Sequence, residues 1–466
     1  MFNRVKNAVI GAVSSGTELN GYRESSVGGS KQYGQSQLLA PKFPYGRPHF
    51  LHLEDDEVQM SADHKLRPII HPSKPLPHHT GYAECVNAGK SKWNEDQAVY
   101  RQGVLTKVLN NVENVDDTQG SQFFFIPYTY YGIFDGHAGV GAALCAANQL
   151  HHILHEKLVD AQDDIWADLS NNRKQHSKPT DLLLIGALES AFTEMDQLIA
   201  EDRTKYQAAG GCTALVALFI LGKLYVANAG DSRAIICSGS EFHPMSVDFT
   251  PENERDRIRQ LAAQQPSLLG DNFTSTEYIQ QPRGDDLGKT IMYREAHMKG
   301  WAYKTLQQND LKISVITGQG KRSRVMGTIG VTRGFGDHDL VAIYQRTPIK
   351  PFLSCHPEVQ VHTITSTDEK DVLVMGTDGL WDVVCGEKAA EIVSKSISTF
   401  MEKERYVSAA TCLVGFARGT LVNEQMWHLK EGKPASCDDI SVFVIPLLPY
   451  KLEYEELMKK YFDKSN

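Results

Sequence analysis

The chain has 466 residues, of which 41% are hydrophobic and 23% are charged, an ordinary composition for a globular protein. The formal net charge of −9 argues against a nucleic-acid-binding protein, because a basic face would be needed and acids outnumber bases here. The eight cysteines contain no CxxC pair and no apolar run approaches the roughly 20 residues of a membrane span, which argues against a disulfide framework, a zinc site and a transmembrane helix. We therefore expect reduced thiols in a cytoplasmic protein.

The first 13 residues show the pattern of a short basic amphipathic helix, with Arg4 and Lys6 beside apolar side chains at helical spacing: Phe2, Val5, Val9 and Ala12. Such a helix can lie on a membrane surface, although a frayed terminus fits the same pattern. Residues 14–42 are rich in Ser, Gly, Gln and Asn, a composition typical of a flexible linker. The sequence thus separates residues 1–42 from the rest of the chain.

Residues 43–80 carry many prolines and histidines, and we expect them to wrap the following domain in an extended form. Beyond them, apolar runs predict strands at 122–134, 213–221, 224–229, 371–376 and 440–446. Amphipathic patterns of period 3.6 predict helices at 139–159, 182–200, 387–401 and 406–421. Because strands and helices do not alternate regularly, the order favours an α+β sandwich over a doubly wound parallel sheet. The polar stretch at about 252–330 is interpreted as an inserted surface subdomain.

Acidic residues adjoin several of the apolar runs. Asp135 and Asp378 come after predicted strands, Asp438 and Asp439 precede another, and further acids occur in Asn94-Glu95-Asp96 and Gly230-Asp231-Ser232-Arg233. A carboxylate at the end of a buried run needs compensation, which a metal ion can supply. Hard oxygen ligands without His or Cys select magnesium or manganese over zinc. A single Asp-Gly after a strand is usually a turn, so the hypothesis depends on the number of such sites in one chain.

At residues 81–446 the chain resembles the PPM, or type 2C, metal-dependent protein phosphatases. The shared motifs, in the order of that family, are Asn94-Glu95-Asp96, Asp135-Gly136-His137-Ala138-Gly139, Gly211-Cys212-Thr213-Ala214, Gly230-Asp231-Ser232-Arg233, Thr332-Arg333-Gly334-Phe335-Gly336-Asp337, Asp378-Gly379-Leu380-Trp381-Asp382 and Asp438-Asp439. The segment Phe43-Pro44-Tyr45-Gly46-Arg47-Pro48, the segment Asn87-Ala88-Gly89-Lys90-Ser91 and the long insertion after Thr250 are similar to the H/J/M branch.

The resemblance implies a four-layer α-β-β-α sandwich of two antiparallel sheets flanked by helices, with an inserted flap subdomain. The phosphatase domain would span residues 43–450, including the flap at about 252–330, and residues 451–466 would form a C-terminal tail.

The resemblance also implies the site residues. One Mg²⁺ or Mn²⁺ would be held by Asp135, Asp378 and Asp438, and a second by Glu95, Asp135 and the carbonyl of Gly136. A third, looser ion would use Asp231, Asp378 and Asp382. His137 resembles the general acid of the family. Many members place an arginine that binds phosphate shortly before the Glu-Asp pair, where this chain has Lys90 and Lys92, and the H/J/M pattern favours Lys90. A lysine cannot offer the bidentate fork of a guanidinium.

The implied function is a metal-dependent hydrolase that acts in signalling on phosphoserine and phosphothreonine in proteins, by direct attack of a water that bridges two metal ions. Similarity to the H/J/M branch suggests phosphorylated Rab-type small GTPases as substrates, and peripheral contact with Golgi or vesicle membranes through residues 1–13. The alternative is a pseudophosphatase scaffold, which loss of a bridging carboxylate would favour. The spacing Cys412-x5-Arg418 is that of cysteine phosphatases, but it falls in a predicted helix rather than in a phosphate-binding loop.

Overall fold

The computed structural model describes residues 46–109, 122–170, 178–201, 209–342, 346–365, 368–422 and 426–461. The chain divides into two units, Met1–Lys42 and Phe43–Asn466. The amphipathic helix expected at residues 1–13 and the linker expected at 14–42 lie outside the described residues. Within the described ranges, no helix combines the length and the apolar character that crossing a membrane requires.

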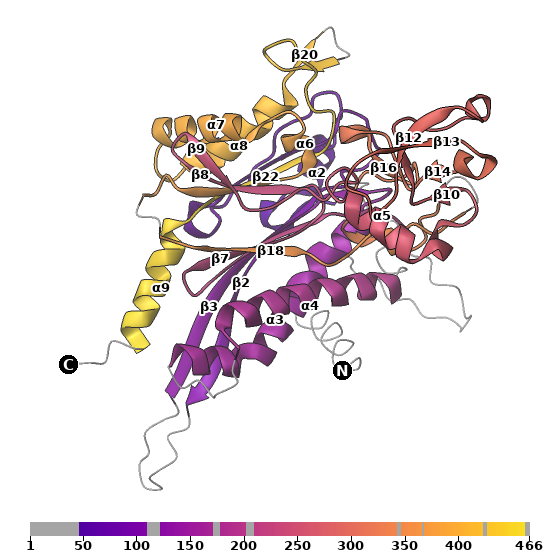
Figure 1. The fold of residues 1–466 in the computed structure, drawn as a ribbon. Helices are drawn as coiled ribbons and strands as arrows, with labels where there is room; N and C mark the ends of the chain where they lie inside the picture. Colours follow the sequence, from indigo (N-terminus) through magenta and orange to yellow (C-terminus); the bar gives the residue numbers. More distant parts are fainter. Residues whose placement is uncertain are drawn as a thin grey trace, which may run out of the picture. The chain divides into compact units, whose positions relative to one another are not determined.

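Two five-stranded antiparallel sheets form the centre of the second unit (Figure 1). The strand order of the first sheet is β1 (Gly81–Cys85), β22 (Ile440–Pro446), β19 (Val372–Gly376), β8 (Arg233–Ser238) and β9 (Glu241–Pro244). That of the second is β18 (Glu358–Thr363), β7 (Lys223–Ala229), β6 (Ala214–Ile220), β3 (Gln122–Phe134) and β2 (Gln97–Leu109). Aromatic side chains such as Tyr131 and Phe443 fill the space between the sheets, with ring centroids 5.4 Å apart. Central strands such as β6 are buried on both faces, which explains their continuous apolar sequence.

Helices cover the outer face of each sheet. The helices α3 (Gly141–Leu169) and α4 (Thr180–Glu201) share one apolar core with the second sheet, and α7 (Gly386–Thr399) and α8 (Arg405–Arg418) share another with the first. The four-layer α-β-β-α sandwich expected from the resemblance is confirmed. The helix predicted at 139–159 begins later, because Gly139 has a φ of +122°, and it continues to Leu169. The helix predicted at 406–421 ends at Arg418, because Gly419 takes a left-handed φ of +69°.

The residues before β1 form a strap along the sandwich, which we call the N-terminal strap (residues 46–80). It contains the 3₁₀ turns η1 (His49–Leu51) and η2 (Pro77–His79) and the helix α2 (Asp55–Ser61), so it is less extended than the sequence suggested. Phe50, Leu51 and Leu76 of the strap are buried between the two sheets. Ile70 adds one bridge to the edge strand β1, at Glu84.

At the other end of the unit, the helix α9 (Leu448–Tyr461) takes in much of the expected C-terminal tail. The ring of Tyr450 stacks on Phe219 with the centroids 4.0 Å apart, and its hydroxyl lies 2.8 Å from that of Tyr131. The beginning of α9 is therefore part of the core between the sheets.

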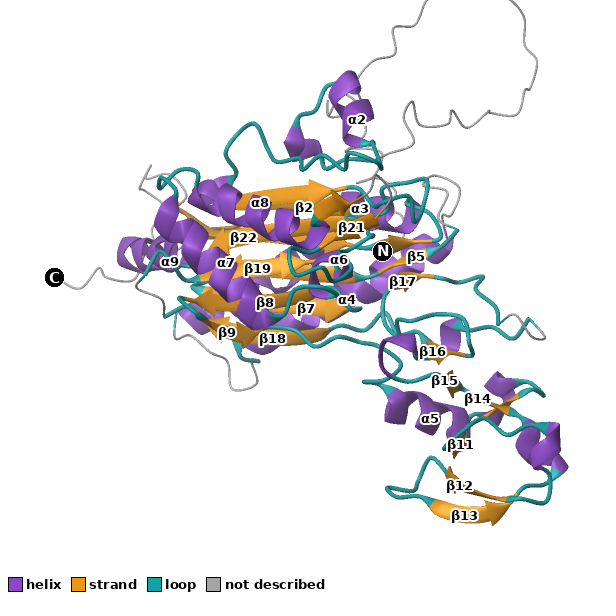
Figure 2. Cartoon of the chain, turned by 90° about the horizontal axis from the view of Figure 1, so that it is seen from above, coloured by secondary structure: helices purple, strands orange, loops and turns teal. Residues whose placement is uncertain are grey.

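The polar segment at about 252–330 forms a subdomain with an apolar core of its own, which we call the insertion (Figure 2). Its elements are α5 (Arg255–Gln264), η3 (Pro266–Leu269), β10 (Phe273–Thr274), β11 (Glu277–Tyr278), η4 (Gly284–Asp286), β12 (Thr290–Arg294), β13 (Ala302–Thr305), η5 (Gln308–Leu311), β14 (Ile313–Ser314), β15 (Ile316–Thr317), η6 (Gly320–Arg322) and β16 (Arg324–Val325). The nearly buried Glu254 holds the two ends of the insertion together, because its carboxylate accepts hydrogen bonds from Arg257, Thr332 and Arg333. The turn η7 (Lys350–Phe352) and the hairpin of β20 (Thr420–Val422) and β21 (Met426–His428) lie outside the insertion.

Candidate metal centre and active site

The predicted site residues lie at strand ends. Asp135 stands between β3 and the short strand β4 (Gly136–His137), and Asp378 begins the short helix α6 (Asp378–Trp381) just after β19. Asp438 lies two residues before β22, the neighbour of β19 in the first sheet, where Gly376 pairs with Val442. The antiparallel pairing thus brings acids that are distant in sequence to one end of the sandwich.

Several of these carboxyl groups are buried and close to one another. Burial, followed by the neighbouring Asp378, raises the pKa of Asp135 and of Asp231 well above the ordinary value. Burial and the charges of Asp438 and Asp382 raise the pKa of Asp378 to about 6, and its carboxyl shares a hydrogen bond with that of Asp135. A buried acid cluster of this kind needs cationic compensation.

Glu95 and Gly136 lie side by side. The Gly136 amide donates to the Glu95 carbonyl at 3.2 Å, and the Glu95 carboxylate accepts the Gly139 amide at 2.6 Å. A Cβ on residue 136 would lie 2.6 Å from the Glu95 carbonyl oxygen, so this contact requires glycine. Asp439 fixes the other side of Glu95 by accepting its amide at 3.0 Å.

Lysine side chains already contact two of the acids. Lys90 forms an ion pair with Asp438. Burial lowers the pKa of its ammonium, but the hydrogen bond to Asp438 and the charges of Asp438, Asp378 and Asp135 together raise that pKa above the ordinary value. The ammonium of Lys321, in η6 of the insertion, lies 2.8 Å from Oδ1 and 3.1 Å from the backbone carbonyl of Asp382. Sequence reasoning missed Lys321, because no motif links this part of the insertion to the acids.

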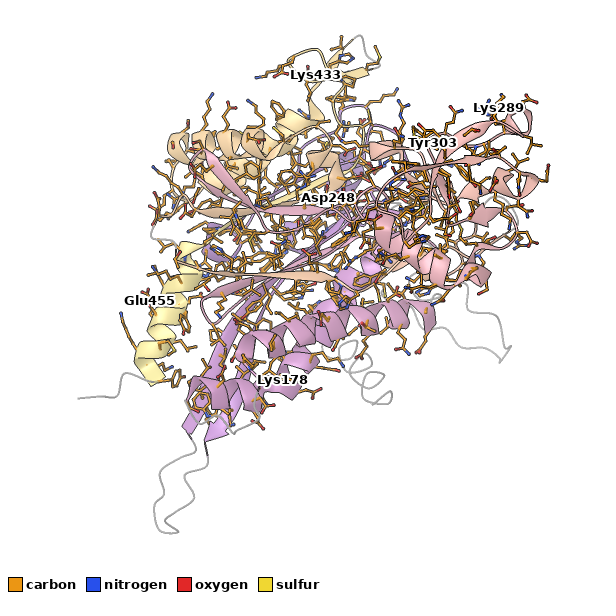
Figure 3. All side chains as sticks on the ribbon, in the orientation of Figure 1. Lys178, Asp248, Lys289, Tyr303, Lys433 and Glu455 are labelled. Carbon is orange, nitrogen blue, oxygen red and sulfur yellow. The ribbon has the colours of Figure 1, made fainter. Side chains whose placement is uncertain are left out.

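An ion pair between Arg233 and Asp248 lies close to Asp231. Arg233 at the start of β8 donates two hydrogen bonds to Asp248, at 3.0 and 2.6 Å, and Asp248 lies near the middle of the molecule in Figure 3. The charge of Asp248 also contributes to the raised pKa of Asp231. Arg233 is therefore ion-paired with Asp248.

His137 is oriented by a carboxylate that the sequence reasoning placed in a motif without giving it a role. Its Nε2 lies 2.8 Å from Oδ2 of Asp337, and the imidazole is one-third exposed whereas Asp337 is buried. A small sheet of β4, β5 (Gly211–Cys212) and β17 (Phe335–Gly336) brings them together. A Cβ on Gly211 would lie 2.2 Å from the same Asp337 oxygen. The signal in the sequence was an Asp directly after the run Gly334-Phe335-Gly336.

The donor set fits a hard divalent cation, because the clustered ligands are carboxylates and a backbone carbonyl. In the described part of the chain, no group of three or more His, Cys, Asp or Glu side chains is already arranged around a metal position. The carboxylates of Asp438 and Asp382 contact Lys90 and Lys321, whose ammonium groups would compete with a metal ion for the same oxygens.

The competing cysteine-phosphatase pattern does not form a site. Cys412 and Arg418 both lie on α8, and the Arg418 guanidinium donates to the carbonyl of Arg67 at 2.7 Å. A helix does not turn its amides toward a phosphate in the way that such a loop requires.

Comparison with known proteins identifies the family to which the chain belongs. The model of the family described as "Protein phosphatase 2C" matches residues 125–266 and 306–423. The chain is 41% identical to Protein phosphatase 1H of Homo sapiens, over 96% of this chain and 99% of that one. It is 39% identical to Protein phosphatase 1J of Mus musculus, over 96% and 98%. Among solved structures, a serine-threonine phosphatase 2C from Toxoplasma gondii matches with a TM-score of 0.43 and 16% identity, over 82% of this chain and 99% of that one.

Replacing one clustered carboxylate should separate metal binding from stability. In Asp378→Asn, loss of a buried charge should leave the metal-free protein as stable as the wild type or more so. Manganese at a hundred times its dissociation constant should stabilise the wild type by about 2.7 kcal/mol and the variant by much less. Thermal unfolding with EDTA and with MnCl₂ measures both effects. Glu241→Gln, at an exposed position of β9, is the matched control, and equal stabilisation of Asp378→Asn and the control would contradict the site.

Proposed function

We propose, from the membership of this chain in the protein phosphatase 2C family, that it is a magnesium- or manganese-dependent hydrolase of phosphoserine and phosphothreonine in proteins. The observation that carries the proposal is the buried, mutually repelling cluster of Asp135, Asp231 and Asp378 at one end of the sandwich. A protein would not retain such a cluster for stability, because each buried charge costs free energy unless a cation compensates it.

Different residues of the chain would hold the metal ions and orient the phosphate. Asp135, Asp378 and Asp438 would hold one ion, Glu95, Asp135 and the Gly136 carbonyl a second, and Asp231, Asp378 and Asp382 a looser third. Such ions, when bound, supply Lewis-acid activation of the attacking water and neutralise phosphoryl charge. No protein nucleophile is needed, so attack by water is direct. Lys90, held at Asp438, lies beside the same acids and is the candidate side chain for orienting the phosphate.

Proton transfer to the leaving group falls to His137. The Asp337 carboxylate, 2.8 Å from Nε2, fixes the orientation of the imidazole. A protonated imidazole that is one-third exposed can reach the serine or threonine oxygen as the P–O bond breaks.

The first test is metal dependence. The purified protein should hydrolyse p-nitrophenyl phosphate and phosphothreonine peptides with Mg²⁺ or Mn²⁺ and lose this activity in EDTA, whereas Cys412→Ser should leave it unchanged. Asp135→Asn should abolish turnover, with Asp286→Asn in the insertion as control. Metal binding without turnover would instead favour the pseudophosphatase scaffold. Activity that survives EDTA and is lost in Cys412→Ser would refute the proposal.

The second test concerns the His137–Asp337 pair. His137→Ala should lower kcat by about 10²- to 10⁴-fold for phosphoserine peptides and least for p-nitrophenyl phosphate, whose leaving group needs no proton. Asp337→Asn should show the same dependence on the leaving group with a smaller loss. The neighbouring His338, whose Nε2 contacts the Asp196 carbonyl, provides the control His338→Gln. Equal losses for both substrates would show that His137 is not the acid.

For the substrate, we extend the proposal to phosphorylated Rab-type small GTPases. Its support is the position of the insertion, which contacts Asp382 through Lys321 and exposes large side chains such as Trp301 and Tyr303. Figure 3 labels Tyr303 on this subdomain. Exchanging the insertion for that of a distant family member should reduce turnover of the phospho-GTPase and spare p-nitrophenyl phosphate. An unchanged ratio of the two rates would exclude a role for the insertion in substrate choice.

For the location, the proposal is a cytoplasmic enzyme that visits Golgi or vesicle membranes through residues 1–13. The supporting observation is the basic amphipathic pattern of that segment. Deleting residues 1–13 should slow dephosphorylation of the same GTPase when it is tethered to anionic liposomes, but not when it is free in solution. An equal rate on liposomes before and after the deletion would leave the segment without this role.

A further inference from the structure

The N-terminal strap places a buried cation against the backbone of one predicted metal ligand. Arg67 is fully buried, and its guanidinium donates three hydrogen bonds to backbone carbonyls. Nε donates to Val86 at 2.7 Å, Nη1 to Ser436 at 2.7 Å and Nη2 to Asp438 at 2.8 Å. The third acceptor is the carbonyl of a predicted metal ligand that lies 371 residues further along the chain.

The backbone around Arg67 is held so that the side chain can reach these carbonyls. Arg67 has a left-handed φ of +47°, an unfavourable conformation for a residue with a long side chain. Its amide donates to the Asp63 carbonyl at 2.7 Å, and its own carbonyl accepts from Arg418 at 2.7 Å. The fold thus keeps the Arg67 backbone in a strained conformation, which places the guanidinium against these three carbonyls.

The three acceptors belong to two segments that must stay in register. Val86 follows β1, whereas Ser436 and Asp438 precede β22, and these strands pair with Cys85 opposite Ile440. The three donors of Arg67 are on different nitrogens of a planar guanidinium and reach carbonyls on both segments, whereas the donors of a lysine ammonium share one nitrogen. All three acceptors are backbone carbonyls, so the guanidinium bonds to the backbone of the two segments and not to the Asp438 carboxylate.

Movement of the Ser436–Asp439 backbone would displace more than one ligand. Asp439 accepts the amides of Asn87 at 2.7 Å and Glu95 at 3.0 Å. A Cβ on Gly379, the residue after Asp378, would lie 1.9 Å from the Asp439 carbonyl oxygen. The position of Asp438, Glu95 and Asp378 relative to one another therefore depends on the segment that Arg67 holds.

We propose that Arg67 is a positioning residue for metal binding, through which the N-terminal strap sets the affinity of the site for divalent cations. The inference rests on the proposed function, because it requires Asp438, Glu95 and Asp378 to be metal ligands. Groups that orient metal ligands typically change metal affinity by about 10- to 100-fold when they are replaced.

The test uses Arg67→Lys in the full chain, with Arg67→Gln as a second variant, and measures Mn²⁺ binding by isothermal titration calorimetry beside thermal unfolding in EDTA. We expect the Mn²⁺ dissociation constant to rise about 10- to 100-fold, and the metal concentration for half-maximal turnover of p-nitrophenyl phosphate to rise with it while kcat at saturating metal changes less.

Arg259→Lys is the matched control. Arg259 is also a buried arginine, and it donates to the carbonyls of Arg294 and Glu295 at 3.0 and 2.8 Å, but within the insertion. Arg259→Lys should lower the unfolding temperature and leave the Mn²⁺ dissociation constant within twofold of the wild type. The same result for Arg67→Lys would overturn the inference, and so would failure of both Arg67 variants to fold, since either would make the residue purely structural. Absence of Mn²⁺ binding by the wild type would refute the proposed function itself.

Discussion

Repulsion between buried carboxylates is the constraint on which the rest of this molecule depends. Asp135, Asp231 and Asp378 lie where burial and each other's charge oppose ionisation. The surrounding structure keeps them together by other means: neighbouring antiparallel strands, a glycine at 136 that permits close backbone approach, and a buried guanidinium that bonds to carbonyls. The stability of this frame thus offsets the free-energy cost of gathering buried acids.

Two lysines from different parts of the chain form ion pairs with acids of this site. Lys90 lies in the loop after β1 and contacts Asp438, and Lys321 comes from the insertion and contacts Asp382. Both side chains are largely exposed, so water weakens each contact and both lysines can leave at small cost. The insertion is therefore joined to the acid cluster by a contact that is easily broken, whereas its base is fixed by the nearly buried Glu254.

Much of the fold could be predicted from the sequence, because buried strands and amphipathic helices leave local patterns. The strands predicted at 122–134 and 440–446 have the observed bounds. Helix ends were less predictable, since Gly139 and Gly419 act through left-handed backbone conformations rather than through hydrophobic periodicity. The acids could be singled out because each adjoins a strand within a recognisable motif. Asp337, Lys321 and Arg67 could not be assigned roles, because each acts through a partner that is distant in sequence, which no local pattern specifies.

Both ends of the second unit are built into one interior. Phe50 and Leu76 enter the space between the sheets from the strap, and Tyr450 enters it from α9. Loss of either part would consequently open the same hydrophobic layer. The residues that close this layer at both ends lie outside the segments that the family model matches, 125–266 and 306–423.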